Sequence, residues 1–430
     1  MKYFRTKIQK LSQNITPFGG ISYVNDVFNQ CGLEQLIDKE LGIRSQKVGF
    51  SYGDIFRGWF DLFFCGGDCA EDIQLHLGDH LKQIPCNSVP SADTLLRGIK
   101  ELAVPNTEVI STSGKSYQFN INAKMNDLNI SLLTLTGQLK SGHSYDFDYD
   151  NQIISHDKYD STSTYKKTKG YFPGIATIGD KIVYIENRDG NANVKTEQAA
   201  TLQIAYGLLK KHGVNVHRSR MDAGSYSEDI VDVVSQNSKL FYIRANKSLS
   251  LTGRIREITD WQSVEINFKD YQVSTLDFIQ FFEQRKYRLV VMREKSDDPQ
   301  LDLFTGDNFI YRCILTNDWD SSEKEVIEYY NGRGSSEKTF DIQNNDFGWG
   351  HLPCSDLHYN TVYLILTAMI KNFYNYIICK VSKVFTDILP ISRLKRFLFK
   401  FIYVPGRWIY RSRQWILGLY TDRPYEKLFV

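Results

Sequence analysis

The chain has 430 residues, of which 42% are hydrophobic and 24% are charged, and its formal net charge is +2. This length allows two or three domains with a sizeable core, and the composition is that of an ordinary globular protein. The total charge is too small to indicate a nucleic-acid partner, so any such indication must come from how the charges are distributed.

The cysteines and the apolar segments exclude several classes of protein. Seven cysteines are scattered along the chain, and Cys65 and Cys69 have no second pair that would complete a zinc site. The N-terminus lacks an apolar stretch of signal-peptide length, and the most apolar run, 362–370, is too short to cross a bilayer. We therefore expect a cytoplasmic protein with reduced thiols and no membrane segment.

The first part of the chain has mostly helical patterns. Apolar residues recur at helical spacing over 21–41, residues 50–65 are strongly apolar, and Ser91 is a suitable N-cap for a further helix. Another helix is expected over 121–139. We assign 1–140 to a helical N-terminal domain for DNA binding or dimerisation. Most of its apolar residues should form the core of a helical bundle, and which helix contacts DNA is left open.

From residue 144 the pattern changes to short strands separated by Gly and polar turns. Three strands are expected over Tyr145–Tyr149, Tyr171–Ile178 and Lys181–Glu186. A helix, a strand, a second helix and a second strand should follow, over 196–212, 214–221, 226–236 and 240–245. The order β-β-β-α-β-α-β is that of a ribonuclease-H-like domain, an open mixed sheet with helices on its faces.

The remaining elements complete this α/β fold. An irregular, strand-like alternation after residue 246 predicts a β-rich insertion. A strand over 311–316 and a helix from Ser322 resume the core, and the long apolar helix 359–380 should pack on the sheet. The expected parts are a helical N-terminal region, the first part of the catalytic core, the β-rich insertion, the second part of the core and a basic helical C-terminal region, over 1–140, 141–246, 247–309, 310–384 and 385–430.

Two acidic sites fall where strand ends can hold carboxylates rigidly. Asp146, Asp148 and Asp150 project from one face of the first strand, because side chains alternate along a strand. Asp222 follows the strand 214–221 in a turn that leads into a helix. Taken alone, the first group could be solvated acids at a strand end, and Asp222 could be the N-cap of the next helix.

Tyr330, Arg333 and Glu337 are spaced so that they share one side of a helix. Offsets of three and seven residues nearly match whole turns, which puts the guanidinium one turn before the carboxylate. The plain alternative for Glu337 is an exposed ion pair with Arg333. Together with two strand-end aspartates, however, a helical glutamate is what phosphoryl transfer by two divalent cations requires, since hard cations bind carboxylate oxygens.

The last of these motifs resembles the signature of the DDE transposases of bacterial insertion sequences. Tyr330, Arg333 and Glu337 match its Tyr-x2-Arg-x3-Glu part, whereas Asn344 stands where the signature has Lys. A β-rich insertion between the second and third acids is also similar to this family. The resemblance spans roughly residues 140–380.

The two aspartate sites fit the same family. There the first Asp ends the opening strand, often in an Asp-x-Asp-x-Thr setting, and Asp146-Phe147-Asp148 matches with Asp150 in place of Thr. The second Asp typically precedes a small residue and Gly, as in Asp222-Ala223-Gly224. We choose Asp148 as the first acid and keep Asp146 as the alternative.

The resemblance implies that Asp148, Asp222 and Glu337 hold two Mg²⁺ ions, for which Mn²⁺ should substitute. It implies metal-dependent hydrolysis of the phosphodiester at the transposon end, followed by strand transfer by the freed 3′-hydroxyl. Tyr330 and Arg333 would hold phosphates of the DNA end, since a planar guanidinium can bind two phosphate oxygens.

Further DNA contacts are expected outside this motif. Between residues 391 and 415 seven Lys or Arg interleave with aromatic residues and no Asp or Glu occurs. Those expected to contact DNA are Arg393, Arg396, Arg407 and Arg411. Lys166 and Lys167, in a loop after the first strand, are further candidates. A solvated amphipathic helix and a solvated loop are the plain alternatives.

We therefore expect a DNA transposase that binds double-stranded DNA, both terminal inverted repeats and target, as a homodimer. One alternative is a nuclease on the same fold that cuts without strand transfer. The other is a non-catalytic DNA-binding protein derived from a transposase, for which the departures at Asn344 and Asp150 leave room.

Overall fold

The computed structural model describes residues 6–10, 14–44, 49–111, 114–246, 248–278, 281, 285–296 and 308–429. It divides into two compact units, Met1–Gly98 with Tyr374–Val430, and Ile99–Phe373. The first unit thus combines both ends of the chain, which the sequence-based division had placed in separate N-terminal and C-terminal regions.

The first unit is built mainly from helices. Ser51 starts α3 with a reciprocal cap, because its Oγ accepts from Asp54 N and the Asp54 carboxylate accepts from Ser51 N. The helical segment predicted over 21–41 forms as two helices, because Gly32 has a φ of +74° and turns the chain between them. The described elements are α1 (Ile21–Gln30), α2 (Leu33–Leu41), α3 (Tyr52–Phe64), the π-helix η1 (Ile73–Leu77), α4 (Gly78–Leu81), α5 (Ala92–Leu102), α13 (Leu394–Phe397), the π-helix η4 (Leu398–Ile402), β15 (Gly406–Arg411), β16 (Gln414–Leu419) and the 3₁₀ turn η5 (Tyr425–Leu428).

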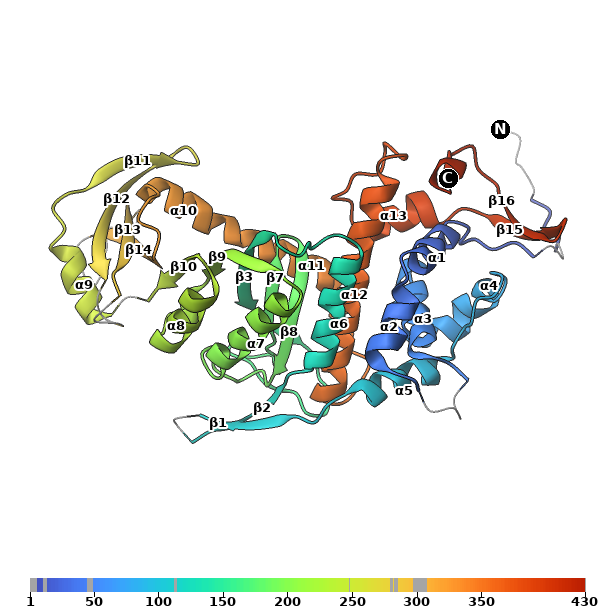
Figure 1. Ribbon diagram of the computed structural model, residues 1–430, viewed down its shortest axis with the longest axis horizontal. Coiled ribbons are helices and arrows are strands. Elements are labelled where there is room, and N and C mark those ends of the chain that lie inside the picture. Colours follow the sequence, from blue (N-terminus) through green and yellow to red (C-terminus); the bar gives the residue numbers. More distant parts are fainter. Residues whose placement is uncertain are drawn as a thin grey trace. The chain divides into compact units, whose positions relative to one another are not determined.

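The C-terminal region is only partly helical. After α13 and η4 the chain forms the hairpin β15–β16, with Tyr410 paired to Trp415 and Arg411 to Gln414 (Figure 1). The predicted helix is therefore wrong for this stretch. Trp, Tyr and Ile at alternating positions favour strands, and this preference outweighs the basic, amphipathic character on which the prediction rested.

The second unit is a mixed α/β structure around a large mixed sheet. The strand order is β1-β2-β8-β7-β3-β9-β10-β14-β13-β12-β11, and β4, β5 and β6 form a separate small sheet. The strands are β1 (Thr107–Ile110), β2 (Ser116–Asn120), β3 (Ser144–Asn151), β4 (Ile154–Ser155), β5 (Thr162–Ser163), β6 (Lys169–Tyr171), β7 (Gly174–Ile178), β8 (Lys181–Arg188), β9 (Asn215–Met221), β10 (Leu240–Ala245), β11 (Gln262–Ile266), β12 (Lys269–Phe278), β13 (Tyr287–Lys295) and β14 (Phe309–Thr316). The helices are α6 (Ala123–Leu135), α7 (Gln198–Lys211), the 3₁₀ turn η2 (Ala223–Ser225), α8 (Glu228–Asn237), α9 (Leu249–Arg256), α10 (Glu323–Asn331), the 3₁₀ turn η3 (Gly332–Gly334), α11 (Ser335–Asp346) and α12 (Leu357–Val381).

The predicted order of elements between residues 144 and 245 is confirmed. β3, β7, β8, α7, β9, α8 and β10 follow one another as expected, and β3, β9 and β10 are parallel neighbours. Parallel strands end at the same edge of a sheet, so the residues at the ends of β3 and β9 lie close together. This places the predicted aspartate sites side by side.

The two faces of the large sheet are covered differently. Phe147, Phe241 and Ile243 point into a core with residues of α6, α7 and α8. The alternate residue Tyr242 points to the other face, into a smaller core with Val326 and Ile327 of α10. Figure 1 shows α10 along one side of the sheet. The aspartates of β3 alternate with Phe147 and therefore lie on the α10 face.

Two parts of the second unit differ from the sequence-based expectation. The hairpin β1–β2 lies in a region predicted to be helical, and it joins the large sheet through β8. The insertion after residue 246 contributes β11, β12 and β13 as predicted, but it also contains the helix α9. The insertion extends the large sheet itself, since β13 pairs with β14 along eight residue pairs.

The predicted long apolar helix is α12. By length and composition it could cross a membrane, but 83% of its most apolar window is buried inside the protein. Its Asn372 exchanges hydrogen bonds with the backbone of Ile182 in β8, at 2.8 and 3.2 Å. The helix thus packs on the sheet, as expected, and is a core helix.

Candidate active site

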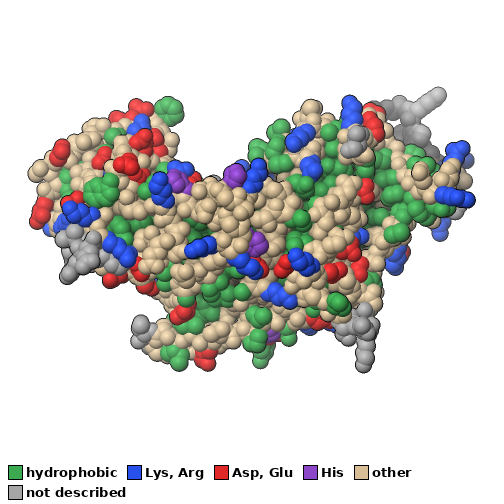
Figure 2. All heavy atoms as spheres, viewed as in Figure 1, with side chains coloured by type: hydrophobic (Ala, Val, Ile, Leu, Met, Phe, Trp, Pro, Cys, Tyr) green, Lys and Arg blue, Asp and Glu red, His purple; other side chains and the backbone are tan. Residues whose placement is uncertain are grey.

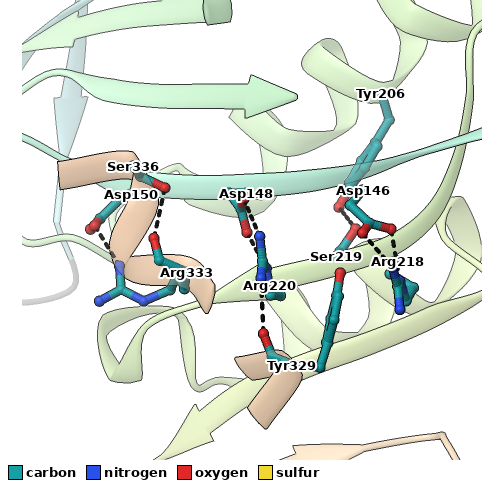
Figure 3. Close-up of polar contacts among 10 residues, drawn as sticks. All are labelled: Asp146, Asp148, Asp150, Tyr206, Arg218, Ser219, Arg220, Tyr329, Arg333 and Ser336. Carbon is teal, nitrogen blue, oxygen red and sulfur yellow. Dashed lines mark hydrogen bonds and ion pairs between the residues drawn. The ribbon is translucent and has the colours of Figure 1, made fainter. Parts of the chain in front are cut away.

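A ladder of ion pairs connects β3 and β9 on the α10 face (Figure 3). Asp146 lies opposite Arg218, and its two carboxylate oxygens accept from Nε and Nη2 at 2.8 and 2.6 Å. Asp148 lies opposite Arg220 and is bound in the same bidentate way, at 2.6 and 2.7 Å. Each guanidinium therefore neutralises the aspartate beside it.

Asp148, the predicted first metal ligand, is engaged on both oxygens. Its side chain is only 2% exposed, and burial raises its pKa while the hydrogen bonds and charge of Arg220 oppose that rise. Removing one partner of a buried ion pair leaves an uncompensated charge. Asp148 is thus placed to hold Arg220, and each of its oxygens accepts a hydrogen bond from that guanidinium.

Arg220 also holds the end of α10. Its Nη1 donates to the carbonyl oxygen of Tyr329 at 2.9 Å, and its guanidinium lies 4.6 Å from the centre of the Tyr329 ring. A Cβ on Gly332 would lie 2.7 Å from the same Nη1, so the absence of a side chain there allows this approach. Arg220 connects β3 and β9 to the segment that carries Arg333 and Glu337.

The acidic and basic residues at the ends of β3 and β9, the third rung of the ladder, differ from those of the first two ion pairs. Tyr149 pairs with Met221, and Asp150 and Asp222 are the residues that follow them. The charge of Asp222 acts on Asp150 and raises its pKa. Asp222 has extended backbone angles, φ −78° and ψ −177°, and therefore continues the alternation of β9. Where the earlier rungs pair an aspartate with an arginine, both residues of this rung are aspartates.

Arg333 supplies the positive charge at the third rung. Its Nη1 donates to Asp150 Oδ2 at 2.5 Å. The other oxygen of Asp150, Oδ1, accepts from Asn151 N at 2.9 Å. Burial and the charge of Asp222 raise the pKa of Asp150 to about 6, and Arg333 and the Asn151 hydrogen bond oppose that rise. One guanidinium thus faces two carboxylates, which leaves a local excess of negative charge that favours a cation.

Asp222 uses only part of its capacity as an acceptor. Its Oδ1 accepts from Gly224 N at 2.9 Å and caps η2, so the predicted capping role is present. Its Oδ2 accepts no hydrogen bond from the residues that the structure describes. One carboxylate oxygen therefore remains available for a ligand.

Tyr330, Arg333 and Glu337 do not lie on one continuous helix. α10 ends at Asn331, η3 follows, and α11 begins at Ser335, whose neighbour Ser336 donates from Oγ to Arg333 O at 3.0 Å. The expected ion pair between Arg333 and Glu337 is absent, because Arg333 binds Asp150 instead. Glu337 is exposed in the first turn of α11 and has no hydrogen bond or ion pair with a described residue.

The three predicted ligands are not gathered into one compact set. Among the described residues, only Asp68, Cys69 and Asp72 bring three ligand atoms within 4.8 Å of one another. In that group Asp72 Oδ2 accepts from the backbone N–H of Asp68 and of Cys69, which makes it part of an exposed turn. The chemistry of the third rung suits a divalent cation better, since it offers only hard carboxylate oxygens.

The other predicted DNA contacts lie in separate elements. Lys166 and Lys167 are exposed in the turn between β5 and β6 and have no carboxylate partner among the described residues. In the first unit, α13 carries exposed Arg396 with half-buried Arg393 at its N-cap, and β15 carries exposed Arg407 and Arg411. Tyr330 is half-buried and lines a cavity of about 250 Å³ between α10 and the sheet.

Arg218 and Arg220 were not expected to be the partners of Asp146 and Asp148. A signal for them is present in the two strands, which read Asp-x-Asp-x-Asp over 146–150 and Arg-x-Arg-x-Asp over 218–222. Aligning these two patterns in register would have paired the first two aspartates with arginines. It would also have left Asp150 beside Asp222.

Among the comparisons with known proteins, a family profile identifies the family of this chain. Among solved structures, a cryo-EM structure titled as a piggyBac transposase synaptic complex with hairpin DNA has a TM-score of 0.42 and 10% identity, over 89% of this chain and 78% of that one. No curated protein matches the chain. A profile of the family described as transposase DDE domain group 1 matches residues 3–430. The chain therefore belongs to the transposase DDE domain family, group 1.

Proposed function

We propose that this chain is a DNA transposase that hydrolyses the phosphodiester at the transposon end and then joins the freed 3′-hydroxyl to target DNA. Its membership of the transposase family over nearly the whole chain supports the general activity. The observation that carries the site is the electrostatic effect of Asp222 on Asp150, the residues that directly follow the last pair of β3 and β9. We further propose a ribonuclease-H-like core, for which the order of β3, β7, β8, α7, β9, α8 and β10 is the support.

We propose Asp150, Asp222 and Glu337 as the metal ligands. Asp150 is preferred to the expected Asp148 because a buried guanidinium binds Asp148 through two nitrogens. Asp150 accepts one bond from Arg333 and one from the backbone N–H of Asn151, and it also experiences the charge of Asp222. Glu337 is the proposed third ligand because it stands four residues after Arg333, which already reaches Asp150, and because it is exposed and unengaged among the described residues.

Two Mg²⁺ ions, or Mn²⁺ as a substitute, would supply charge stabilisation of the attacking and leaving oxygens when bound. The protein's own groups do the positioning. β3 and β9 hold two carboxylates at fixed separation, and Arg220 fixes the end of α10 relative to these strands. Arg333 is in place to bind a phosphate of the DNA end once its carboxylate partner is neutralised, and Tyr330 lies in the turn before it.

The proposed partner is double-stranded DNA, both the terminal inverted repeats and the target, bound by a homodimer. Lys166, Lys167, Arg396 and Arg407 are exposed cations that support DNA contact outside the catalytic site. Phosphate contacts of this kind position DNA without reading its sequence.

The test is excision from a plasmid that carries the gene with its native flanking DNA. Wild type should excise in the presence of Mg²⁺, whereas Asp150→Asn, Asp222→Asn and Glu337→Gln should not. Glu328→Gln is the matched control, since Glu328 is an exposed carboxylate one element earlier that pairs only with Lys324, at 3.8 Å. Excision by Glu337→Gln at the wild-type level would remove Glu337 from the site.

Strand transfer is tested separately with precut ends that carry a 3′-hydroxyl. A nuclease would cleave the donor but join none of these ends to a target plasmid, and that outcome would select the first alternative. Specific DNA binding with neither cleavage nor joining, and no effect of Asp222→Asn on Mn²⁺ binding, would select the non-catalytic alternative.

A further inference from the structure

The hairpin β15–β16 has two unlike faces. Side chains alternate along each strand, so Arg407, Ile409 and Arg411 share one face with the cross-strand residues Gln414 and Ile416. Figure 2 shows Lys and Arg side chains beside hydrophobic ones at this end of the molecule, at the right of the view. We call this set the arginine face of the hairpin.

The first unit covers the opposite face only in part. Trp408 and Leu417 pair across the strands and line a cavity of about 530 Å³ together with Ser22 and Asp26 of α1, and Ile416 of the arginine face lines the same cavity. Nearer the turn the rings of Tyr410 and Trp415 lie 5.0 Å apart, a cross-strand contact that stabilises a two-stranded ribbon, and they are 60% and 52% exposed. The hairpin is therefore supported near Trp408, and the end that carries Arg411 is exposed on both faces.

The cations of the hairpin are not neutralised. No Asp or Glu occurs between Asp387 and Asp422 in the sequence. Arg407, Arg411 and Arg413 are exposed and form no ion pair with a described residue. Asp387, in contrast, is already bound by Lys400 and Arg423. Three unpaired guanidinium groups on a narrow ribbon are suited to a polyanion.

The turn of the hairpin is strained. Ser412 and Arg413 both have positive φ, 53° and 62°, a conformation that two-residue hairpin turns normally assign to Asn and Gly. Glycine would relieve this strain but would remove a cation from the tip. An arginine in this strained conformation at an exposed turn favours a binding role for that position.

We propose that β15–β16 enters a groove of double-stranded DNA with its arginine face. A two-stranded antiparallel ribbon fits the major groove, where Arg can bind guanine edges or flanking phosphates and Gln can bind adenine. Ile409 and Ile416, 43% and 47% exposed, lie between these polar groups, where they can contact thymine methyl groups or sugars. This inference rests on the proposed action on DNA and assigns one DNA contact to a ribbon where a helix was expected.

The test measures binding of labelled duplex from the element's own end by fluorescence anisotropy, without metal and in the Asp222→Asn background. Arg407→Gln and Arg411→Gln should each weaken binding several-fold and reduce the slope of log K against log salt by about 1. Arg97→Gln is the matched control, since Arg97 is an exposed arginine of the first unit on α5. Its affinity and salt slope should remain those of the parent.

Equal affinities and salt slopes for all three variants would overturn the proposal. So would a change in oligomeric state of the DNA-free protein caused by Arg407→Gln or Arg411→Gln with duplex affinity unchanged, because the hairpin would then contact a second copy of the chain. An equal loss of affinity for a single strand of the same sequence would exclude groove binding. Because no cleavage is measured, failure here leaves the metal-ligand assignment untouched, and failure of the excision test leaves this binding test valid.

Discussion

Asp150 follows Tyr149, and Asp222 follows Met221, the last residues paired between β3 and β9, and the charge of Asp222 raises the pKa of Asp150. At the two preceding aspartates of β3, in contrast, an arginine of β9 lies opposite. Arg333, from η3, offsets the negative charge of Asp150. This contrast separates carboxylates that are neutralised by an arginine of the neighbouring strand from a carboxylate that experiences a like charge.

The aspartates of β3 should therefore respond differently to the same substitution. Asp150→Asn should abolish Mn²⁺ binding, measured by calorimetry, with little loss of stability. Asp148→Asn should leave the Arg220 guanidinium buried without its partner and lower the free energy of unfolding by about 3 kcal/mol, measured in urea. Asp146→Asn breaks a more exposed pair and should cost about 1 kcal/mol or less.

Mn²⁺ binding by the folded fraction of Asp148→Asn decides the assignment. Binding at the wild-type level supports Asp150 as the first ligand. Loss of binding by Asp148→Asn, with retention by Asp150→Asn, would restore the ligand expected from the sequence.

Metal binding should depend on pH through Asp150. Its pKa is raised to about 6 by burial and by Asp222, and a cation competes with the proton for the carboxylate. The apparent Mn²⁺ affinity should therefore rise as the pH increases towards 6 and become nearly constant above about 7. An affinity that changes only around pH 4 would contradict the proposed role of this carboxylate.

The same raised pKa affects the metal-free protein in the opposite sense. The folded state binds this proton more tightly than the unfolded chain, in which the pKa of Asp is about 3.9. The stabilisation from protonated Asp150 is thus fully present below about pH 4 and is lost as the pH rises through about 6. Asp150→Asn should remove this part of the pH dependence of the urea midpoint.

Local patterns in the sequence predicted much of the core but not its charge pairing. The alternation of β3 and β9 and the apolar length of α12 follow from side-chain periodicity, which each segment carries by itself. Whether Asp148 or Asp150 is free depends on the register between two strands 72 residues apart, fixed by the contacts of both.

Two other differences between the predicted and the observed structure also have physical causes. Gly332 and Gly334 interrupt the helix expected around Arg333, so the guanidinium turns towards Asp150 and away from Glu337. In the C-terminal region basic residues alone do not specify a helix, and the strand preference of Trp408 and Tyr410 decides the outcome.

Gly332→Ala should perturb the site although the residue contacts no substrate. Its Cβ would lie 2.7 Å from Arg220 Nη1 and would displace the guanidinium from Tyr329 O. We expect a loss of about 1–3 kcal/mol in the free energy of unfolding and a lower excision rate, because a buried hydrogen bond is broken. Gly334→Ala is the control, since a Cβ there meets nothing within 4 Å.

The two glycines should thus give effects of opposite sign. Both have helical backbone angles, so alanine at Gly334 should stabilise the protein by about 0.5 kcal/mol through the unfolded state. A similar gain for Gly332→Ala would show that Arg220 is not confined by this approach and would weaken its role as a positioning residue.

Arg333→Gln should separate metal binding from catalysis. In the metal-free protein Arg333 occupies an oxygen of Asp150 that a cation would use. Removing it should strengthen Mn²⁺ binding at pH 8 by about 1 kcal/mol, or about fivefold, since a competing positive charge is lost. Excision should nevertheless fall, because the guanidinium is proposed to hold a phosphate of the DNA end.

Arg333→Lys retains the charge without the planar fork, so its Mn²⁺ affinity should stay near wild type while its excision rate drops. Weaker Mn²⁺ binding by Arg333→Gln would mean that Arg333 orients Asp150 for the metal, and the proposed competition would be wrong.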